Sequence, residues 1–109
     1  MVRENIIKDI SRNMETGEVI DKLSRTFSIF GDPTRTRIVF ALSKAELCVN
    51  ELSQILDMSH SAISHQLRAL KDLDLVRYRK DGRRSYYSLN DEHIENLFNE
   101  GLKHVLERM

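Results

Sequence analysis

Two short helical patterns joined by a three-residue connection constrain this fold most strongly. Apolar residues recur at helical spacing over 49–56 and again over 59–73, on either side of the connection Asp57–Ser59. Two short helices joined so closely form a helix-turn-helix unit. Residues 75–89 then alternate like strands around Asp81-Gly82, a dipeptide typical of a two-residue hairpin turn. The order predicts a winged helix-turn-helix.

Further helical patterns flank this unit. Apolar spacing over 6–14 and 20–30 predicts two N-terminal helices, and Asp32-Pro33 is typical of a helix start. A stripe of apolar residues over 91–107 predicts the last helix. We therefore expect one mainly α domain over 1–109 with a small β-hairpin.

Composition excludes several classes of protein. No apolar run reaches the ~18–20 residues that a membrane span needs, and the charged N-terminus does not resemble a signal peptide. The single cysteine, Cys48, cannot form an intramolecular disulfide. We expect a cytoplasmic protein without a membrane partner. The short chain and the absence of a pocket-forming architecture argue against an enzyme.

The charge distribution favours contact with a polyanion. The net charge of the chain is +0, but residues 59–90 carry 7 basic and 3 acidic side chains between acidic flanks. Donor side chains on the second helix of the unit and cations on the hairpin are suited to bases and phosphates. The expected DNA contacts are Ser59, His60, Ser61, Ser64, His65, Arg68, Arg79, Lys80, Arg83 and Arg84.

The sequence resembles the ArsR/SmtB family of metal-sensing repressors. The resemblance lies in FGDPTRTRIVFAL (30–42), ELCVNELSQIL (46–56), SHSAISHQLRALKDLDLV (59–76) and RYRKDGRRSYYSL (77–89). It implies a homodimer built on the N-terminal helices (1–30) and the last helix. It also implies that the helix over 59–73 enters the major groove, and that an inducing ligand releases the DNA.

The family has several sensing sites, and this sequence departs from one of them. The thiolate site uses a Cys-x-Cys pair, whereas this chain has Cys48 followed by Asn50 and no N-terminal cysteine. One thiolate cannot build a soft metal site. We therefore expect Cys48 to be a small core residue.

The other family site lies on the last helix, and its pattern is complete here. The pattern is Asp-x-His, a histidine eleven residues later, and Glu or His three residues further on. Asp91, His93, His104 and Glu107 stand at these spacings. Two imidazoles and two carboxylates suit tetrahedral zinc, with cobalt or nickel as possible substitutes. Glu100 falls on the same face and is a further candidate ligand or support.

Helix geometry prevents one chain from completing this site. On an ideal helix His93 and His104 differ by about 20° in direction but lie about 16 Å apart along the axis. Two antiparallel copies would bring His93 of one chain opposite His104 of the other. A symmetric dimer would then carry two equivalent sites across its interface.

The sequence therefore predicts a homodimeric repressor that releases operator DNA on binding zinc. One alternative keeps the repressor and replaces the metal by another signal, such as oxidation of Cys48. Another is a protein-interaction module that reuses the fold without DNA. Operator sequence and target genes cannot be derived from the chain.

Overall fold

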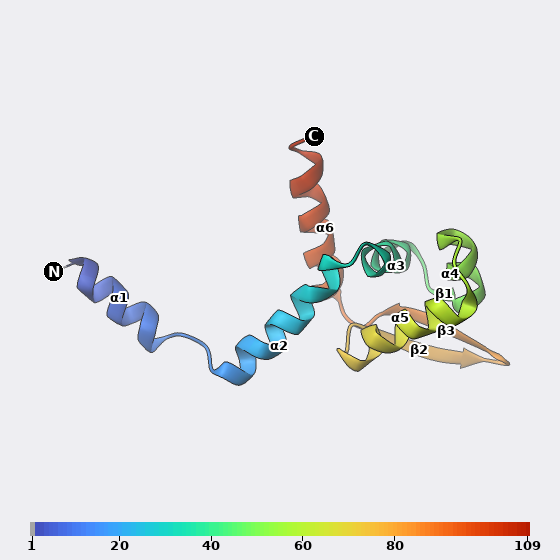
Figure 1. The fold of residues 1–109 in the computed structure, drawn as a ribbon, viewed down its shortest axis with the longest axis horizontal. Helices are drawn as coiled ribbons and strands as arrows, with labels where there is room; N and C mark the ends of the chain where they lie inside the picture. Colours follow the sequence, from blue (N-terminus) through green and yellow to red (C-terminus); the bar gives the residue numbers. More distant parts are fainter. Residues whose placement is uncertain (1) are drawn as a thin grey trace.

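The computed structural model describes residues 2–109, which form six α-helices and a three-stranded sheet (Figure 1). The helices are α1 (Val2–Arg12), α2 (Gly17–Ser28), α3 (Pro33–Lys44), α4 (Val49–Leu56), α5 (His60–Asp72) and α6 (Glu92–Leu106), with a short 3₁₀ turn η1 (Ile29–Gly31). The strands are β1 (Leu47–Cys48), β2 (Val76–Asp81) and β3 (Arg84–Leu89). The predicted winged helix-turn-helix is confirmed.

Several helices begin at a side chain that accepts a backbone N–H. The hydroxyl of Thr16 accepts from Val19 at the start of α2, at 3.3 Å. The carboxylate of Asp32 accepts from Arg35 at the start of α3, at 3.0 Å, with Pro33 following as predicted. Each contact satisfies one of the amide groups that a helix leaves unpaired at its first turn.

The wing is wider than the sequence predicts. The strands pair antiparallel in the order β1-β3-β2, so the two-residue strand β1 adds to the expected hairpin. Gly82 adopts a left-handed φ of 65° at the hairpin turn. This conformation favours glycine, which has no Cβ to clash with the backbone. The Asp81-Gly82 turn is therefore as predicted, whereas β1 was not expected.

The hydrophobic core lies where α3, α4 and α5 meet. Its fully buried side chains include Ile38 and Val39 from α3, Leu52 from α4, and Ile63 and Leu67 from α5. These are non-directional apolar contacts, which together make the helix-turn-helix one packed unit. From α6, Ile94 and Phe98 also join this core.

The two N-terminal helices lie outside this core. Of the residues described in α1 and α2, none is buried, although both helices carry an apolar face. Figure 1 shows them extending away from the body, while α6 projects in another direction. The radius of gyration is 17.8 Å, whereas a compact chain of this length would have about 13 Å. Three helices therefore present surfaces that the single chain does not cover.

The helices were compared with the length and apolar character of a membrane span. Within residues 2–109, no helix combines the length and the apolar character needed to cross a bilayer.

Candidate nucleic-acid interface and metal centre

The turn between α4 and α5 sets the direction of α5. Asp57 ends α4 with a left-handed φ of 54°, and the N–H of Met58 donates to the carbonyl of Ser53 at 3.1 Å. The hydroxyl of Ser59 then accepts the N–H of Ala62 at 3.1 Å and begins α5. Ser59 thus has a structural role in addition to its predicted role at DNA.

The outer face of α5 carries the predicted base-contacting side chains. Ser61, His65 and Arg68 are exposed, and Ser64 is half-buried between them and the core. Their spacing places all four on one side of the helix. Hydroxyl, imidazole and guanidinium groups can each donate to base edges or to phosphate oxygens. This face has the size and chemistry of a recognition surface.

His60 at the start of α5 has a partner on α4. Its Nε2 lies 3.1 Å from Oδ1 of Asn50, and both residues are exposed. An amide oxygen accepts and an imidazole N–H donates, so the two groups can form a hydrogen bond. In the sequence, Asn50 was notable only as the residue at the position of the family's second thiol. The structure adds Asn50 to the candidate interface. Its place in the first turn of the predicted helix over 49–56 is the sequence feature that could have indicated this.

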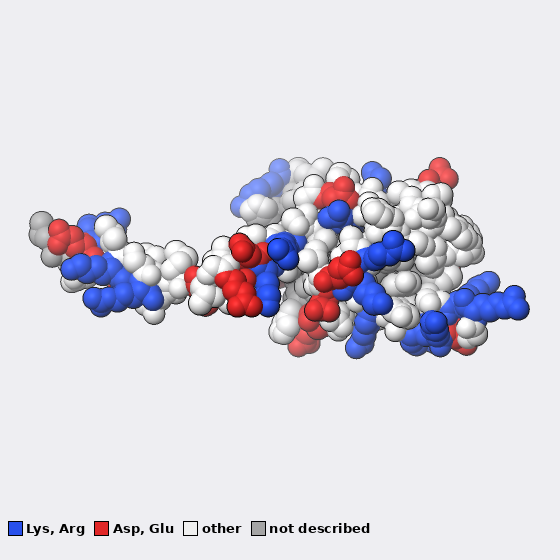
Figure 2. Space-filling view, turned by 60° about the horizontal axis from the view of Figure 1, so that its bottom comes forward, with Lys and Arg blue, Asp and Glu red and all other residues white. Residues whose placement is uncertain are grey.

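Basic side chains gather at the end of the wing. Figure 2 shows Lys and Arg concentrated over the tip of the β2–β3 hairpin, where the sequence places Lys80, Arg83 and Arg84. Lys80 and Arg83 are exposed, and neither has an ion pair among the residues that the structure describes. A cationic hairpin end is suited to phosphate contact.

Two wing arginines are less available than their sequence positions indicate. Arg79 donates through Nε to the carboxylate of Glu46 at 2.8 Å, which raises the pKa of Arg79. Its guanidinium also lies 5.0 Å from the ring centroid of Tyr86. A hydrogen bond with Tyr86 raises the pKa of Arg84 above its ordinary value. Arg79 is thus engaged by Glu46 and Tyr86, and Arg84 interacts with Tyr86, so Lys80 and Arg83 are the freer cations.

Cys48 lies inside the fold, as expected of a core residue. Its exposed fraction is 3%, and its N–H donates to Oε1 of Glu51 at 3.0 Å. That hydrogen bond lowers the pKa of Glu51. The contact therefore stabilises the start of α4 at neutral pH and is lost only as the pH falls through the lowered pKa.

Asp91 begins the helix that carries the candidate metal ligands. Its Oδ1 accepts the N–H of His93 at 2.9 Å and that of Ile94 at 3.2 Å. Asp91 is thus the N-cap residue of α6, immediately before its first turn. These hydrogen bonds use one carboxylate oxygen, so the other can still approach an ion beside His93.

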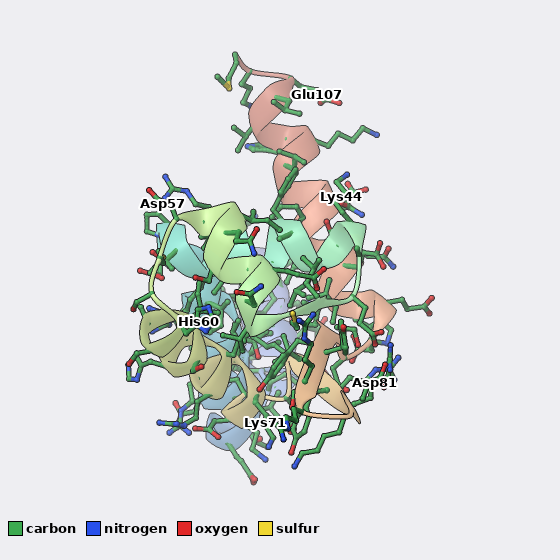
Figure 3. The ribbon with its side chains drawn as sticks, turned by 90° about the vertical axis from the view of Figure 1, so that its right-hand side faces the viewer. Lys44, Asp57, His60, Lys71, Asp81 and Glu107 are labelled. Carbon is green, nitrogen blue, oxygen red and sulfur yellow. The ribbon has the colours of Figure 1, made fainter. Side chains whose placement is uncertain are left out.

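His104 and Glu107 lie near the far end of α6, where Figure 3 shows Glu107 well away from the helix-turn-helix. They line one shallow depression together with Glu100 and Lys103. Within residues 2–109 of one chain, no three His, Cys, Asp or Glu side chains come close enough to hold a metal ion. In one chain, the four predicted ligands therefore lie as two separate pairs, Asp91 with His93 and His104 with Glu107, at opposite ends of α6.

An apolar groove runs beside these ligands. Phe27 and Phe30 form one wall, and Leu97, Gly101 and Val105 of α6 form the other, around a volume of about 500 Å³. Leu97 and Val105 are 38% and 53% exposed. On the helix, His93 and His104 lie within about 40° of Leu97. The histidines thus border an uncovered apolar stripe.

Known proteins share both the sequence and this architecture. The profile described as "Bacterial regulatory protein, arsR family" matches residues 32–78. A "Transcriptional repressor SmtB homolog" of Synechocystis sp. is 39% identical over 101 residues, covering 93% of this chain and 76% of that protein. The chain belongs to the ArsR family.

Two further comparisons support the ArsR assignment. A cadmium resistance regulatory protein, a CadC homolog of Staphylococcus aureus, is 40% identical over 86 residues, covering 78% of this chain and 71% of that protein. The winged helix-turn-helix domain of a possible ArsR-family regulator from Mycobacterium bovis, described as homodimeric, superposes with a TM-score of 0.75. It is 26% identical and covers 88% of this chain and 87% of that one. This ArsR protein is a DNA-binding transcriptional regulator.

The difference between the wing cations can be tested through salt dependence. Arg83→Ala should weaken DNA binding similarly on all sequences and reduce the slope of log K against log salt by about 0.9, as one lost phosphate contact would. Arg79→Ala should change the slope less, because Glu46 already partly neutralises its charge. Titrations from low to moderate salt measure both slopes. Equal slopes for the two variants would contradict the assignment of Arg83 as the freer cation.

Proposed function

We propose that this ArsR protein is a homodimeric repressor whose α5 enters the major groove of operator DNA. The observation that carries the proposal is the exposed donor face of α5 next to a basic wing, on a protein with uncovered apolar helices. The wing would contact the flanking backbone. The contacts are those expected from the sequence: Ser59, His60, Ser61, Ser64, His65, Arg68, Arg79, Lys80, Arg83 and Arg84.

The uncovered surfaces of α1, α2 and α6 support a dimer through the terminal helices. Gly101 lies within α6, where glycine costs about 1 kcal/mol relative to alanine. A Cβ built on Gly101 would meet nothing within 4 Å in its own chain. In the proposed dimer its smallness would allow a second chain to approach closely. The homodimeric description of the Mycobacterium bovis protein agrees with this arrangement.

Antiparallel pairing of two α6 helices supports a metal site between the chains. If the two-fold axis passes between residues 98 and 99, His93 of one helix lies at the same height as His104 of the other. Asp91 of one helix and Glu107 of the other then lie at nearly the same height, on the same side of each histidine pair. The donor set fits tetrahedral zinc, and cobalt(II) can mimic it, whereas nickel prefers more ligands.

Zinc bound at these sites would supply a link between the two α6 helices. The side chains of α6 that border the groove would then hold the terminal helices in one relative arrangement. Because α6 packs against α3 and β3, that arrangement affects the spacing of the two α5 helices on the operator. Coupling free energies of about 1–3 kcal/mol would lower operator affinity about 5–150-fold.

The oxidation alternative is less well supported by the structure. Cys48 is buried beneath the wing, so an oxidant would have little access to its thiol. The metal proposal instead uses side chains that are exposed on α6. Names of relatives also support a metal effector, since the CadC homolog is described as a cadmium resistance regulator.

The test is a titration of DNA from the intergenic region upstream of the gene, with and without zinc, cobalt, nickel and cadmium. We expect tight binding without metal and weaker binding with zinc. Linkage requires that operator DNA lower zinc affinity by the same factor. Equal zinc affinity with and without operator would eliminate zinc-controlled release, and salt-independent or absent DNA binding would favour a protein-interaction module.

A further inference from the structure

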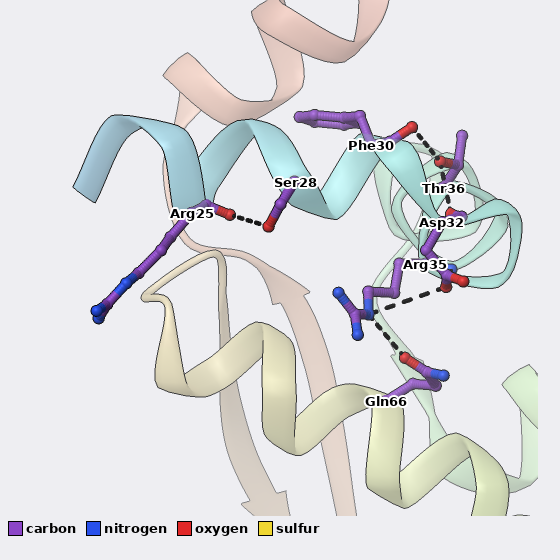
Figure 4. Close-up of polar contacts among 7 residues, drawn as sticks. All are labelled: Arg25, Ser28, Phe30, Asp32, Arg35, Thr36 and Gln66. Carbon is purple, nitrogen blue, oxygen red and sulfur yellow. Dashed lines mark hydrogen bonds and ion pairs between the residues drawn. The ribbon is translucent and has the colours of Figure 1, made fainter. Parts of the chain in front are cut away.

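A polar corner joins the end of η1 to the start of α3 (Figure 4). The carboxylate of Asp32 caps α3 through the N–H of Arg35. The hydroxyl of Thr36 lies 2.9 Å from the carbonyl of Asp32 and 3.4 Å from that of Phe30. Two side chains, Asp32 and Thr36, therefore tie this corner to the backbone on either side of it.

Arg35 connects this corner to α5. Its Nε donates to Oε1 of Gln66 at 2.9 Å, and the same nitrogen lies 3.9 Å from Oδ2 of Asp32. The Arg35 side chain is only 31% exposed, and Gln66 is half-buried. Among residues 2–109, this is the only hydrogen bond that joins a side chain of α3 to a side chain of α5.

Gln66 occupies a particular position around α5. It lies between the exposed His65 and the buried Leu67, on the edge between the outer face and the core. The core contacts of α5 are apolar and set no hydrogen-bond geometry for its rotation. A hydrogen bond is directional and weakens steeply when misaligned. Gln66 is thus placed where a single bond can oppose rotation of α5 about its axis.

A small rotation would matter at the outer face. With side chains about 6 Å from the helix axis, a turn of about 15° moves their ends by about 1.5 Å. A hydrogen bond of normal length to a base edge does not survive such a displacement. The side chains affected would be those on the Ser61–Arg68 face.

We propose that Arg35 and Gln66 are positioning residues for operator binding, which fix the rotation of α5 without touching DNA. The inference rests on the proposed role of α5 as the recognition helix. Asp32 contributes by holding Arg35 in place from the α3 side. The pair acts through the outer face of α5, so its effect is on operator affinity.

The experiment compares Arg35→Lys, Gln66→Leu and the double variant in operator titrations. Lysine keeps the charge but lacks Nε–H, and leucine keeps most of the volume but cannot accept. Since a hydrogen bond to a charged group is involved, each single variant should bind the operator about 10-fold more weakly. The double variant should bind no more weakly than either single variant, because all three lose the same bond.

The matched control is Arg25→Lys on α2. Figure 4 shows the Arg25 side chain pointing away from the corner. Its backbone carbonyl accepts the hydroxyl of Ser28 at 2.6 Å. We expect its operator affinity to be unchanged. Thermal melting of every variant provides a second measurement, and the melting temperatures of the Arg35 and Gln66 variants should change too little to account for the loss.

Three results would overturn the positioning role. If Arg35→Lys binds normally while Arg35→Ala lowers the salt slope by about one contact, Arg35 touches a phosphate directly. If the losses of the single variants add in the double variant, the two residues act independently. If melting falls in parallel with affinity, the role is merely structural.

A separate variant tests the assumption about α5. His65→Ala should weaken operator binding if α5 is the recognition helix. Loss of affinity in Arg35→Lys with none in His65→Ala, Ser64→Ala or Arg68→Ala would show that the recognition assignment has failed, and the positioning role would fail with it. Loss in the face variants alone would leave the recognition assignment standing and reject the Arg35–Gln66 proposal.

Discussion

Replacing Leu97 with aspartate should convert the dimer into monomers and weaken operator binding by at least about 100-fold. Leu97 stands on the uncovered apolar stripe of α6, beside the proposed two-fold axis. Each copy would lose about 2 kcal/mol of apolar burial, and two carboxylates would face one interface. With both copies changed, the dimerisation constant should fall about 1,000-fold or more, since each 1.4 kcal/mol is tenfold.

Sedimentation analysis at micromolar concentration measures this change, and operator titration measures its consequence. The control is Ile55→Asp, which places the same charge at an exposed apolar residue of α4 outside the groove. Ile55→Asp should leave the dimer intact. A Leu97→Asp protein that stays dimeric at micromolar concentration would show that α6 does not form the interface.

Replacing His104 with alanine should leave operator binding intact and abolish the response to zinc. Mutation of a residue that only supports a metal ligand typically lowers metal affinity about 10–100-fold. Loss of a ligand itself should therefore lower zinc affinity by more than about 100-fold. The 5–150-fold effect of zinc on operator affinity should then fall to about 1. Zinc binding is measured by calorimetry, and DNA release by titration with and without the metal.

Mixing two variants distinguishes sites between chains from sites within one chain. In a dimer of one His93→Ala chain and one His104→Ala chain, one site lacks both histidines and the other keeps both. When the two inactive proteins are mixed and allowed to exchange, about half of the dimers should be mixed and recover one tight site each. No recovery of zinc binding after proven exchange would contradict the inter-subunit arrangement.

Local patterns predicted most of the fold. The helices over 49–56 and 59–73 and the Asp81-Gly82 turn depend on residues close together in the chain, and the structure contains all three. The strand β1 could not be predicted in the same way. It has two residues and exists through its pairing with β3, almost forty residues later.

The availability of the candidate site residues was the least predictable feature. The pairing of Arg79 with Glu46 spans 33 residues, and that of Arg35 with Gln66 spans 31. Such pairings depend on how separate elements pack, so a list of exposed cations from sequence overstates how many are free. The N-cap position of Asp91, by contrast, depends only on contacts with the neighbouring residues His93 and Ile94.

The uncovered apolar faces of α1 and α2 have a consequence for how long the protein persists in a cell. A lone chain presents to proteases and chaperones two helices that carry exposed Ile, Leu and Phe side chains and few tertiary contacts. Pairing would cover them. Unpaired subunits should therefore be degraded faster than paired ones, so that the cell retains the regulator chiefly in the form able to span an operator.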